Sequence, residues 1–321
     1  MIRCFLSDVP APAALARLRG LVWAAGLGAA LLAGDLQAQQ PAAKLEPAMS
    51  RIRDRGVVTI AHRPDAFPVG YLDANKRAAG YGIDVCREIV RLMERDLKRP
   101  LRINWVEVSA RTRFEFVATG KADMECGNTI NDPNRRKNFG YAMPYLFTGP
   151  RFLVRVDSGI EGLHDLAGKR IGVVSGTNAI PLLKTRIDGG SLKGASIVEF
   201  KTYEEGLAAV EKGDVAAFAT IELLLAGQRA RSQRPEALRI VGAYLALEPV
   251  AILLPKDDVE LKRTVDRHLA ALMLDGTVAS IYNKWFMQPI PPENLKMDLP
   301  IPPVLRDQLR WPSDRLGDEV R

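Results

Sequence analysis

Apolar residues recur at two spacings along the first half of the chain, and each spacing is typical of one kind of element. After a polar lead at residues 39–50, residues 57–61 and 122–126 have the short apolar runs of strands and residues 101–108 alternate as a strand does. Apolar side chains at helical spacing predict helices over residues 82–97 and 112–118. This alternation of strands and helices predicts a parallel sheet with helices on both faces.

The same alternation restarts in the second half, so the sequence predicts two α/β units in series. The pattern predicts strands over residues 151–156, 170–174, 196–200, 216–220, 238–241 and 250–254, and helices from 179, over 203–212, over 222–230 and over 259–274. A last helix ends at Trp285 and Phe286, which we interpret as core residues. Six prolines lie between residues 289 and 303, so the Pro-rich tail at residues 296–321 is expected to be extended chain.

The N-terminal segment has the outline of a signal peptide. An apolar run at residues 21–33 (LVWAAGLGAALLA) follows Arg17 and Arg19 and precedes Leu-Gln-Ala at residues 36–38. The run is too short to span a bilayer, which takes about 20 apolar residues. We therefore predict that residues 1–38 are cleaved and that the mature chain is periplasmic.

Composition and charge narrow the possible classes. The chain has 321 residues, of which 47% are hydrophobic and 26% charged, and this is ordinary globular material with room for two domains. Its formal charge is +7, and it falls to +6 without residues 1–38, which hold three arginines and two aspartates. Because the charges are interspersed and form no basic block with aromatic residues, no nucleic-acid partner is predicted.

Cysteine and histidine positions bear on disulfides and metals. Cys4 leaves with the signal peptide, so Cys86 and Cys126 remain in an oxidising compartment, where a single disulfide is expected. Two buried free thiols are the alternative. The three histidines are scattered at 62, 164 and 268, so neither a metal site nor a cofactor is predicted.

The candidate site lies at the carboxyl ends of the predicted strands, where open α/β sheets bind ligands. Arg63, Asn128 and residues 175–178 and 221–222 stand at such ends, and Arg113 and Arg135 lie in the polar stretch at residues 109–145. Arginine grips carboxylates with a planar fork, so this set predicts a captured carboxylate in a cleft that closes by hinge motion. For residues 109–145 the alternative is a solvated basic loop, and for Thr177 and Asn178 it is a plain helix N-cap.

Several segments together resemble the periplasmic glutamate/aspartate-binding proteins of ABC importers, within the wider family of polar amino-acid solute-binding proteins. The likeness covers roughly residues 51–295. Its strongest segments are IAHR at 60–63, GKADMECGN at 120–128, DLAGK at 165–169, VSGT at 174–177, LLAG at 224–227 and KWFMQPIPP at 284–292.

This resemblance implies a two-lobed Venus-flytrap fold, with each lobe a mostly parallel sheet flanked by helices. Residues 51–148 would form the first part of lobe 1, residues 149–250 lobe 2, and residues 251–295 the return to lobe 1. The two hinge strands would lie near residues 149–154 and 248–253.

Carried over by position, the ligand arginines of the family fall on Arg63, Arg113 and Arg135. Family positions that commonly hold hydroxyl side chains fall on Ala110, Asn128, Ile130 and Asn178, and a histidine falls on Tyr203. These departures predict a ligand that differs in detail from those of the family.

The most consequential departure is Ile221. In the family, an aspartate that pairs with the ligand ammonium usually stands at this position. A buried ammonium without a counter-charge costs several kcal/mol. Either another residue supplies the carboxylate, for which the adjacent Glu222 is the candidate, or the ligand has no ammonium. We predict a preference for an acid that lacks a primary amine.

The sequence therefore predicts a monomeric binding protein, not an enzyme. It would capture a small anionic ligand, an acidic amino acid or related organic acid, and hand it to the permease of an ABC importer. The alternative is a periplasmic dehydratase-like enzyme on the same fold acting on a carboxylated substrate, for which Glu222, Glu125 and Tyr203 are the candidates for proton transfer. A receptor sensor domain is disfavoured, because no later membrane helix or signalling domain is expected.

Overall fold

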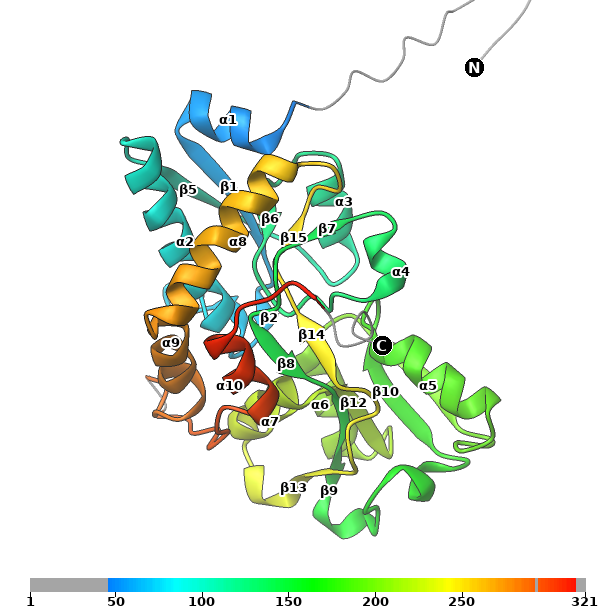
Figure 1. The fold of residues 1–321 in the computed structure, drawn as a ribbon. Coiled ribbons are helices and arrows are strands. Elements are labelled where there is room, and N and C mark those ends of the chain that lie inside the picture. Colours follow the sequence, from blue (N-terminus) through cyan, green and yellow to red (C-terminus); the bar gives the residue numbers. More distant parts are fainter. Residues whose placement is uncertain (1–45, 292–293, 316–321) are drawn as a thin grey trace, which may run out of the picture. The chain divides into compact units, whose positions relative to one another are not determined.

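The structure is a computed structural model that describes residues 46–291 and 294–315. The predicted signal peptide at residues 1–38 lies outside the described residues, as does the end of the predicted tail at residues 316–321. In the part that is described, the main elements surround two five-stranded sheets (Figure 1). The prediction of two α/β units is therefore confirmed.

The first sheet combines strands from both ends of the described chain. In spatial order it contains β5 (Arg102–Glu107), β1 (Val57–His62), β6 (Met124–Glu125), β15 (Leu253–Leu254) and β7 (Gly140–Tyr141). Strand β1 is parallel to β5 and β6, whereas β15 is antiparallel to β6 and β7. The late strand β15 thus returns the chain to the sheet in which it began.

Helices enclose this sheet and build most of its core. They are α1 (Ala48–Arg55), α2 (Tyr81–Leu97), α3 (Thr112–Ala118), α8 (Val259–Leu274) and α9 (Thr277–Phe286). Helices α1 and α3 contact β1, and α2 packs against α8 and α9 (Figure 1). Trp285 and Phe286 at the end of α9 are buried in this core, which confirms the interpretation of both as packing residues.

Short elements between these were absent from the predicted pattern. They are the small antiparallel sheet of β2 (Asp65–Ala66), β3 (Gly70–Leu72) and β4 (Ala78–Ala79), and the one-turn helix α4 (Pro133–Arg136). Helix α1 begins at Ala48, inside the segment treated as a polar lead, because Met49 and Ile52 bury their side chains there. Elements of two to four residues are too short to show a period.

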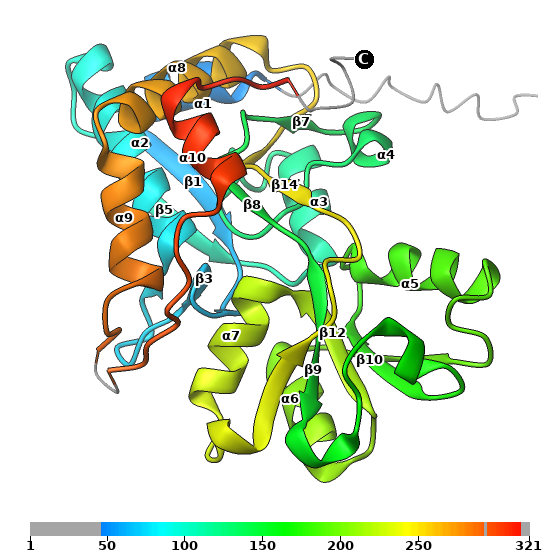
Figure 2. The same ribbon diagram turned by 60° about the horizontal axis from the view of Figure 1, so that its bottom comes forward.

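The second sheet follows the predicted pattern closely. In spatial order it contains β11 (Ser196–Phe200), β10 (Arg170–Val174), β12 (Ala217–Ile221), β9 (Pro150–Arg155) and β13 (Leu238–Val241). Strand β10 is parallel to β11 and β12, whereas β9 is antiparallel to β12 and β13. Helices α5 (Ala179–Asp188), α6 (Tyr203–Lys212) and α7 (Glu222–Arg231) contact this sheet (Figure 2). Three short 3₁₀ turns complete it, η1 (Val156–Ser158), η2 (Leu163–Leu166) and η3 (Pro235–Ala237).

Two paired segments connect the sheets. Strands β8 (Leu146–Thr148) and β14 (Glu248–Val250) run antiparallel, with Thr148 opposite Glu248 (Figure 1). Gly149 joins β8 to β9, and a Cβ atom at this position would lie 2.1 Å from the carbonyl oxygen of Ala246, so only glycine fits. The one strand predicted over residues 250–254 is instead divided between β14 and β15.

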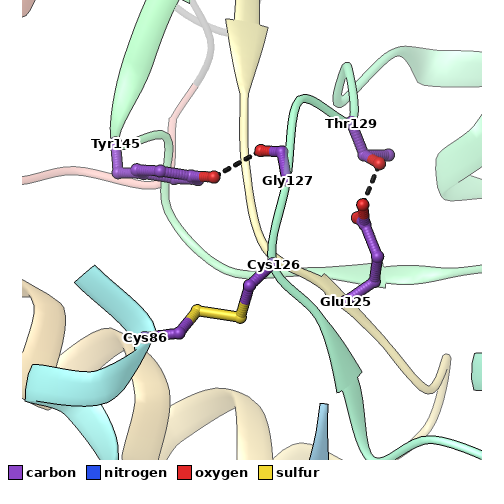
Figure 3. The surroundings of a disulfide bond; sticks show 6 residues. All are labelled: Cys86, Glu125, Cys126, Gly127, Thr129 and Tyr145. Atoms are coloured by element: carbon purple, nitrogen blue, oxygen red, sulfur yellow. Dashed lines mark hydrogen bonds between the residues drawn. A yellow bond between two sulfur atoms is a disulfide. The ribbon is translucent and has the colours of Figure 1, made fainter. Parts of the chain in front are cut away.

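A disulfide joins α2 to the residue that follows β6 (Figure 3). The Cα atoms of Cys86 and Cys126 are 6.4 Å apart, within the usual range for a disulfide, and both side chains are fully buried. The expected disulfide is therefore confirmed, and the alternative of two free thiols is not what the structure shows.

The Pro-rich tail is not wholly extended, so that prediction was wrong for residues 303–310. Helix α10 (Pro303–Arg310) packs against α8 and β8 and buries Leu305 and Gln308. Proline is tolerated in the first turn of a helix, because the N–H that it lacks would have no intrahelical acceptor there. Burial of Leu305 after Pro303 therefore stabilises a helix where the prolines had suggested extended chain.

None of the helices in residues 46–291 and 294–315 is long and apolar enough to cross a bilayer.

Replacing Leu305 with alanine is expected to lower the free energy of unfolding by about 2–4 kcal/mol, because the change leaves a cavity under α10. Denaturant unfolding measures this effect. The exposed neighbour Arg306 provides the control, since Arg306→Ala should change stability by less than about 0.5 kcal/mol. Equal effects of the two substitutions would contradict the docking of α10.

Candidate functional site

A small pocket lies where the carboxyl ends of strands from the two sheets meet. Its walls are formed by Arg113, Asn128, Ile130, Arg135, Pro150, Thr177, Asn178, Ala179, Tyr203, Thr220, Ile221 and Glu248. Eight of the ten ligand-binding residues predicted from the sequence line it, all except Arg63 and Glu222. Residues far apart in the sequence are therefore brought together as the strand-end argument predicted.

Arg113 is the most unusual side chain of this pocket. It is 2% exposed, and its Nε and Nη1 atoms have no hydrogen-bond partner among the described residues. Burial lowers its pKa to about 10, so the guanidinium is still charged at neutral pH. Hydrogen bonds between Ser109 and Thr112 fix the start of α3, which carries Arg113 in its first turn. A cation is disfavoured there unless an anion lies nearby.

Arg135 reaches across the pocket from α4. Asp132 caps this helix by accepting from the backbone N–H groups of Asn134 and Arg135, at 2.9 and 3.2 Å. The Arg135 guanidinium then donates to the carbonyl oxygen of Ile130 at 3.3 Å and to that of Gly176, before α5, at 3.4 Å. Arg135 therefore links the residues around the first sheet to the turn that follows β10.

Arg63 does not line the pocket but lies behind Tyr203. Its Cζ atom is 5.2 Å from the centroid of the Tyr203 ring, and its guanidinium pairs with Asp65 at 2.7 Å. Burial alone would lower the pKa of Arg63, but Tyr203 and Asp65 outweigh burial and raise it. Of the three arginines predicted to meet the ligand, the structure thus places two in the pocket wall and one behind an aromatic ring.

The second sheet contributes helix N-termini to the pocket. Asn178 is the N-cap of α5, Tyr203 is the first residue of α6 and Ile221 is the N-cap of α7. The first N–H groups of a helix have no intrahelical acceptor, and the helix dipole places partial positive charge there. Arginines therefore face helix N-termini across one pocket, an arrangement that favours an anion.

The loop after β6 is held rigidly on both sides of Asn128. Figure 3 shows Tyr145 donating through its hydroxyl to the carbonyl oxygen of Gly127, and Thr129 donating to Glu125 at 2.6 Å. The disulfide at Cys126 anchors the same loop. Asn128 Nδ2 then donates to the Tyr203 hydroxyl at 3.2 Å, which joins the loop to α6.

Two predicted residues, Thr177 and Ile221, present little free polar capacity to the pocket. Thr177 donates its hydroxyl to the carbonyl oxygen of Val174 at 2.7 Å, as in a local turn. Ile221 is 5% exposed and, with Ile130, forms an apolar part of the wall. Thr177 therefore has acceptor capacity only, and Ile221 has none.

Glu222, the sequence candidate for an ammonium counter-charge, is not brought to the pocket. Its carboxylate accepts from the Arg151 guanidinium and from the Tyr244 hydroxyl. Glu222 begins α7 directly after Ile221, and neighbouring residues at a helix start point in different directions. The carboxylate is therefore committed elsewhere.

Sequence reasoning missed Glu248, which lines the pocket from β14. It is 6% exposed, it accepts from Asn178 Nδ2, and its Oε2 atom has no hydrogen-bond partner in the part of the chain described. Burial raises its pKa to about 7. One signal was available in the sequence, because Glu248 stands beside an apolar strand in a predicted hinge. A carboxylate buried there is costly without a partner, so its presence indicates a binding role.

Comparison with known proteins assigns the chain to a family. Residues 58–288 match the family model of bacterial extracellular solute-binding proteins, family 3. The chain belongs to this family. It is 29% identical to the L-glutamate/L-aspartate-binding protein of Pseudomonas aeruginosa, over 92% of this chain and 98% of that one. It is also 29% identical to the glutamate/aspartate import solute-binding protein of Escherichia coli K12, over 90% and 96% of the two chains.

Solved structures agree on the fold. The solute receptor for L-cysteine of Neisseria gonorrhoeae aligns with a TM-score of 0.66 over 78% of this chain and 97% of that one, at 24% identity. The predicted two-lobed binding-protein fold and the prediction of a solute-binding protein, rather than an enzyme, are confirmed by these comparisons. Within residues 46–291 and 294–315, no cluster of three or more His, Cys, Asp or Glu side chains could hold a metal ion.

Proposed function

We propose that this solute-binding protein captures a small acidic ligand, an acidic amino acid or a related organic acid, in the pocket between its sheets. The observation that carries the proposal is Arg113, a buried cation that lines the pocket with two unpartnered nitrogen atoms. Carboxylate oxygens are strong acceptors for arginine N–H groups, so an acidic ligand would supply the partners that these nitrogens lack. The names of the relatives from Pseudomonas aeruginosa and Escherichia coli, which specify glutamate and aspartate, support the same class of ligand.

In this proposal the pocket holds the ligand from both sides. Arg113 and Arg135 bind its carboxylates, Arg63 supports Tyr203 from behind, and the N-termini of α5, α6 and α7 add partial positive charge. Asn128, Ile130, Thr177 and Ile221 shape the remaining wall. Lobe 1 comprises residues 51–148 and 251–295, and lobe 2 comprises residues 149–250. The segments around Gly149 and β14 act as the hinge between these lobes.

The wider setting follows from the family. We propose that residues 1–38 direct export and are removed, that the mature monomer works in the periplasm, and that it delivers its ligand to the permease of an ABC importer. Membership of an extracellular solute-binding family and the word "import" in the name of the Escherichia coli relative support this assignment.

Isothermal titration of ligand-stripped protein tests the proposal. We expect at least one of glutamate, aspartate, dicarboxylates and keto acids to bind with a dissociation constant of about 1 μM or lower, about −8 kcal/mol. Arginine and lysine serve as cationic controls and should not bind. Failure of every carboxylate to bind folded protein would overturn the proposal, and turnover of prephenate-like acids would instead favour the dehydratase-like alternative.

A further inference from the structure

We propose that Glu248 is the counter-charge for a ligand ammonium in this chain, so that the preferred ligand is an acidic amino acid. This inference rests on the proposed function and deepens it. It replaces the expectation that the absence of an acid at position 221 selects ligands without a primary amine.

The charges lining the pocket point to this assignment. Arg113, Arg135 and three helix N-termini supply positive charge, and Glu248 Oε2 is the one unpartnered carboxylate oxygen among the described residues that line the pocket. A complementary ligand therefore carries anionic groups toward the arginines and one cationic group toward Glu248. An acidic α-amino acid has this pattern, and a simple dicarboxylate lacks the cation.

Strand pairing explains how Glu248 compensates for Ile221. Thr148 and Pro150 lie on the same crossing chain, two residues apart. Thr148 pairs with Glu248 on one side, and Pro150 pairs with Ile221 on the other. Glu248 and Ile221 therefore pair with positions two residues apart, at the end of β8 and the start of β9, and both line the pocket. The carboxylate of Glu248 can therefore contact a ligand in the same pocket that an acidic side chain at position 221 would line.

The surroundings of Glu248 permit either charge state. Arg135 of α4 attracts the ionised form, Asp132 at the start of α4 repels it, and Asn178 of α5 donates to it. Arg113 of α3 and Tyr203 of α6 line the same pocket, and Thr148 faces Glu248 from β8. Because burial raises the pKa of Glu248 to about 7, both charge states are accessible near neutral pH.

Ligand binding should therefore be linked to protons. An ammonium favours the ionised carboxylate and expels the proton, so affinity for an amino acid rises as the pH increases from 6 to 8. A ligand without an ammonium gains nothing from the ionised form, and the protonated form can donate to a ligand oxygen. Its affinity is expected to stay level or fall over the same range.

The test compares L-glutamate with glutarate, which differs by the amino group alone, on wild type, Glu248→Gln and the control Glu161→Gln. Glutamine keeps the shape and the Asn178 contact region but removes the charge, whereas Glu161 is exposed and outside the pocket. We expect Glu248→Gln to weaken glutamate binding at least about tenfold, to leave glutarate within about threefold, and Glu161→Gln to change neither.

A second measurement needs no variant. Titration of wild type with glutamate at pH 7 in two buffers of different ionisation enthalpy should show net proton release, which Glu248→Gln abolishes. Equal losses for glutamate and glutarate, or proton release that is unchanged in Glu248→Gln, would overturn the role of Glu248. Binding of glutarate but not glutamate by wild type would overturn it while leaving the proposed function intact. Binding of no carboxylate at all would overturn both.

Discussion

Replacement of Arg113 with alanine is expected to weaken binding of an acidic ligand at least about a hundredfold. Each charge-assisted hydrogen bond in a dry site contributes about 1.5–3 kcal/mol, so losing two corresponds to about 3 kcal/mol or more. The same change removes the positive charge that most strongly lowers the pKa of the buried Glu125, a pKa that burial raises. Glu125 is then expected to take up a proton rather than remain as an isolated charge. Titration calorimetry measures the loss.

Arg111 provides the matched control for Arg113. It lies two residues earlier, 72% of its side chain is exposed, and its charge partner Glu199 is 3.8 Å away. Arg111→Ala should leave affinity within about twofold, because exposed ion pairs contribute little. Arg113→Met retains most of the apolar stem and separates loss of charge from loss of packing. A loss of less than about fivefold in folded Arg113→Met protein would contradict the carboxylate site.

Removal of the disulfide should cost the protein about 3–4 kcal/mol of unfolding free energy. Cys86 and Cys126 are 40 residues apart, and closing a loop of that size restricts the unfolded chain by about 4 kcal/mol. The double substitution Cys86→Ala with Cys126→Ala avoids burying hydroxyl groups where both sulfur atoms are buried. Denaturant unfolding of the two proteins measures the difference.

Reductant provides the control for the disulfide. Dithiothreitol should destabilise the wild type by a similar amount and leave the double variant unchanged. Because Cys126 lies two residues before Asn128, the variant should also bind ligand more weakly than wild type. A stability change below about 1 kcal/mol would show that residual structure in the unfolded chain already holds the two segments together.

The sequence predicted elements best where local pattern and tertiary packing agree. The bounds of α6 and α8 match the predicted ranges, because each helix buries side chains at helical spacing. The bounds of β11 and β13 match as well, although no residue of β11 is fully buried. Helix α10 was missed because the sequence shows its prolines, which favour extended chain. The packing of α10 on α8, which buries Leu305, depends on residues remote in sequence. The split of residues 250–254 into β14 and β15 likewise depends on pairing with two different sheets.

The residues of the candidate site likewise fall into those that the sequence could place and those that it could not. Asn128, Asn178 and Ile221 could be placed from the sequence because each stands at or after the carboxyl end of a strand of one of the two sheets, where ligands of open α/β sheets bind. The direction of a side chain at the start of a helix could not be placed, so Glu222 was kept as a candidate counter-charge although it pairs with Arg151. Glu248 was missed because its burial depends on β8, which is remote in sequence.

The contacts that Asn128 makes with Tyr203, and Arg135 with Gly176, have a kinetic consequence. In the proposed function, both contacts must break before a solute reaches Arg113, so uptake would depend on how often the two lobes part. The apparent affinity is the intrinsic affinity scaled by the fraction of molecules that are open. Under the same proposal, hydrogen bonds as long as 3.2 and 3.4 Å would break readily enough for an open state to collect solute, and their re-formation would slow its escape.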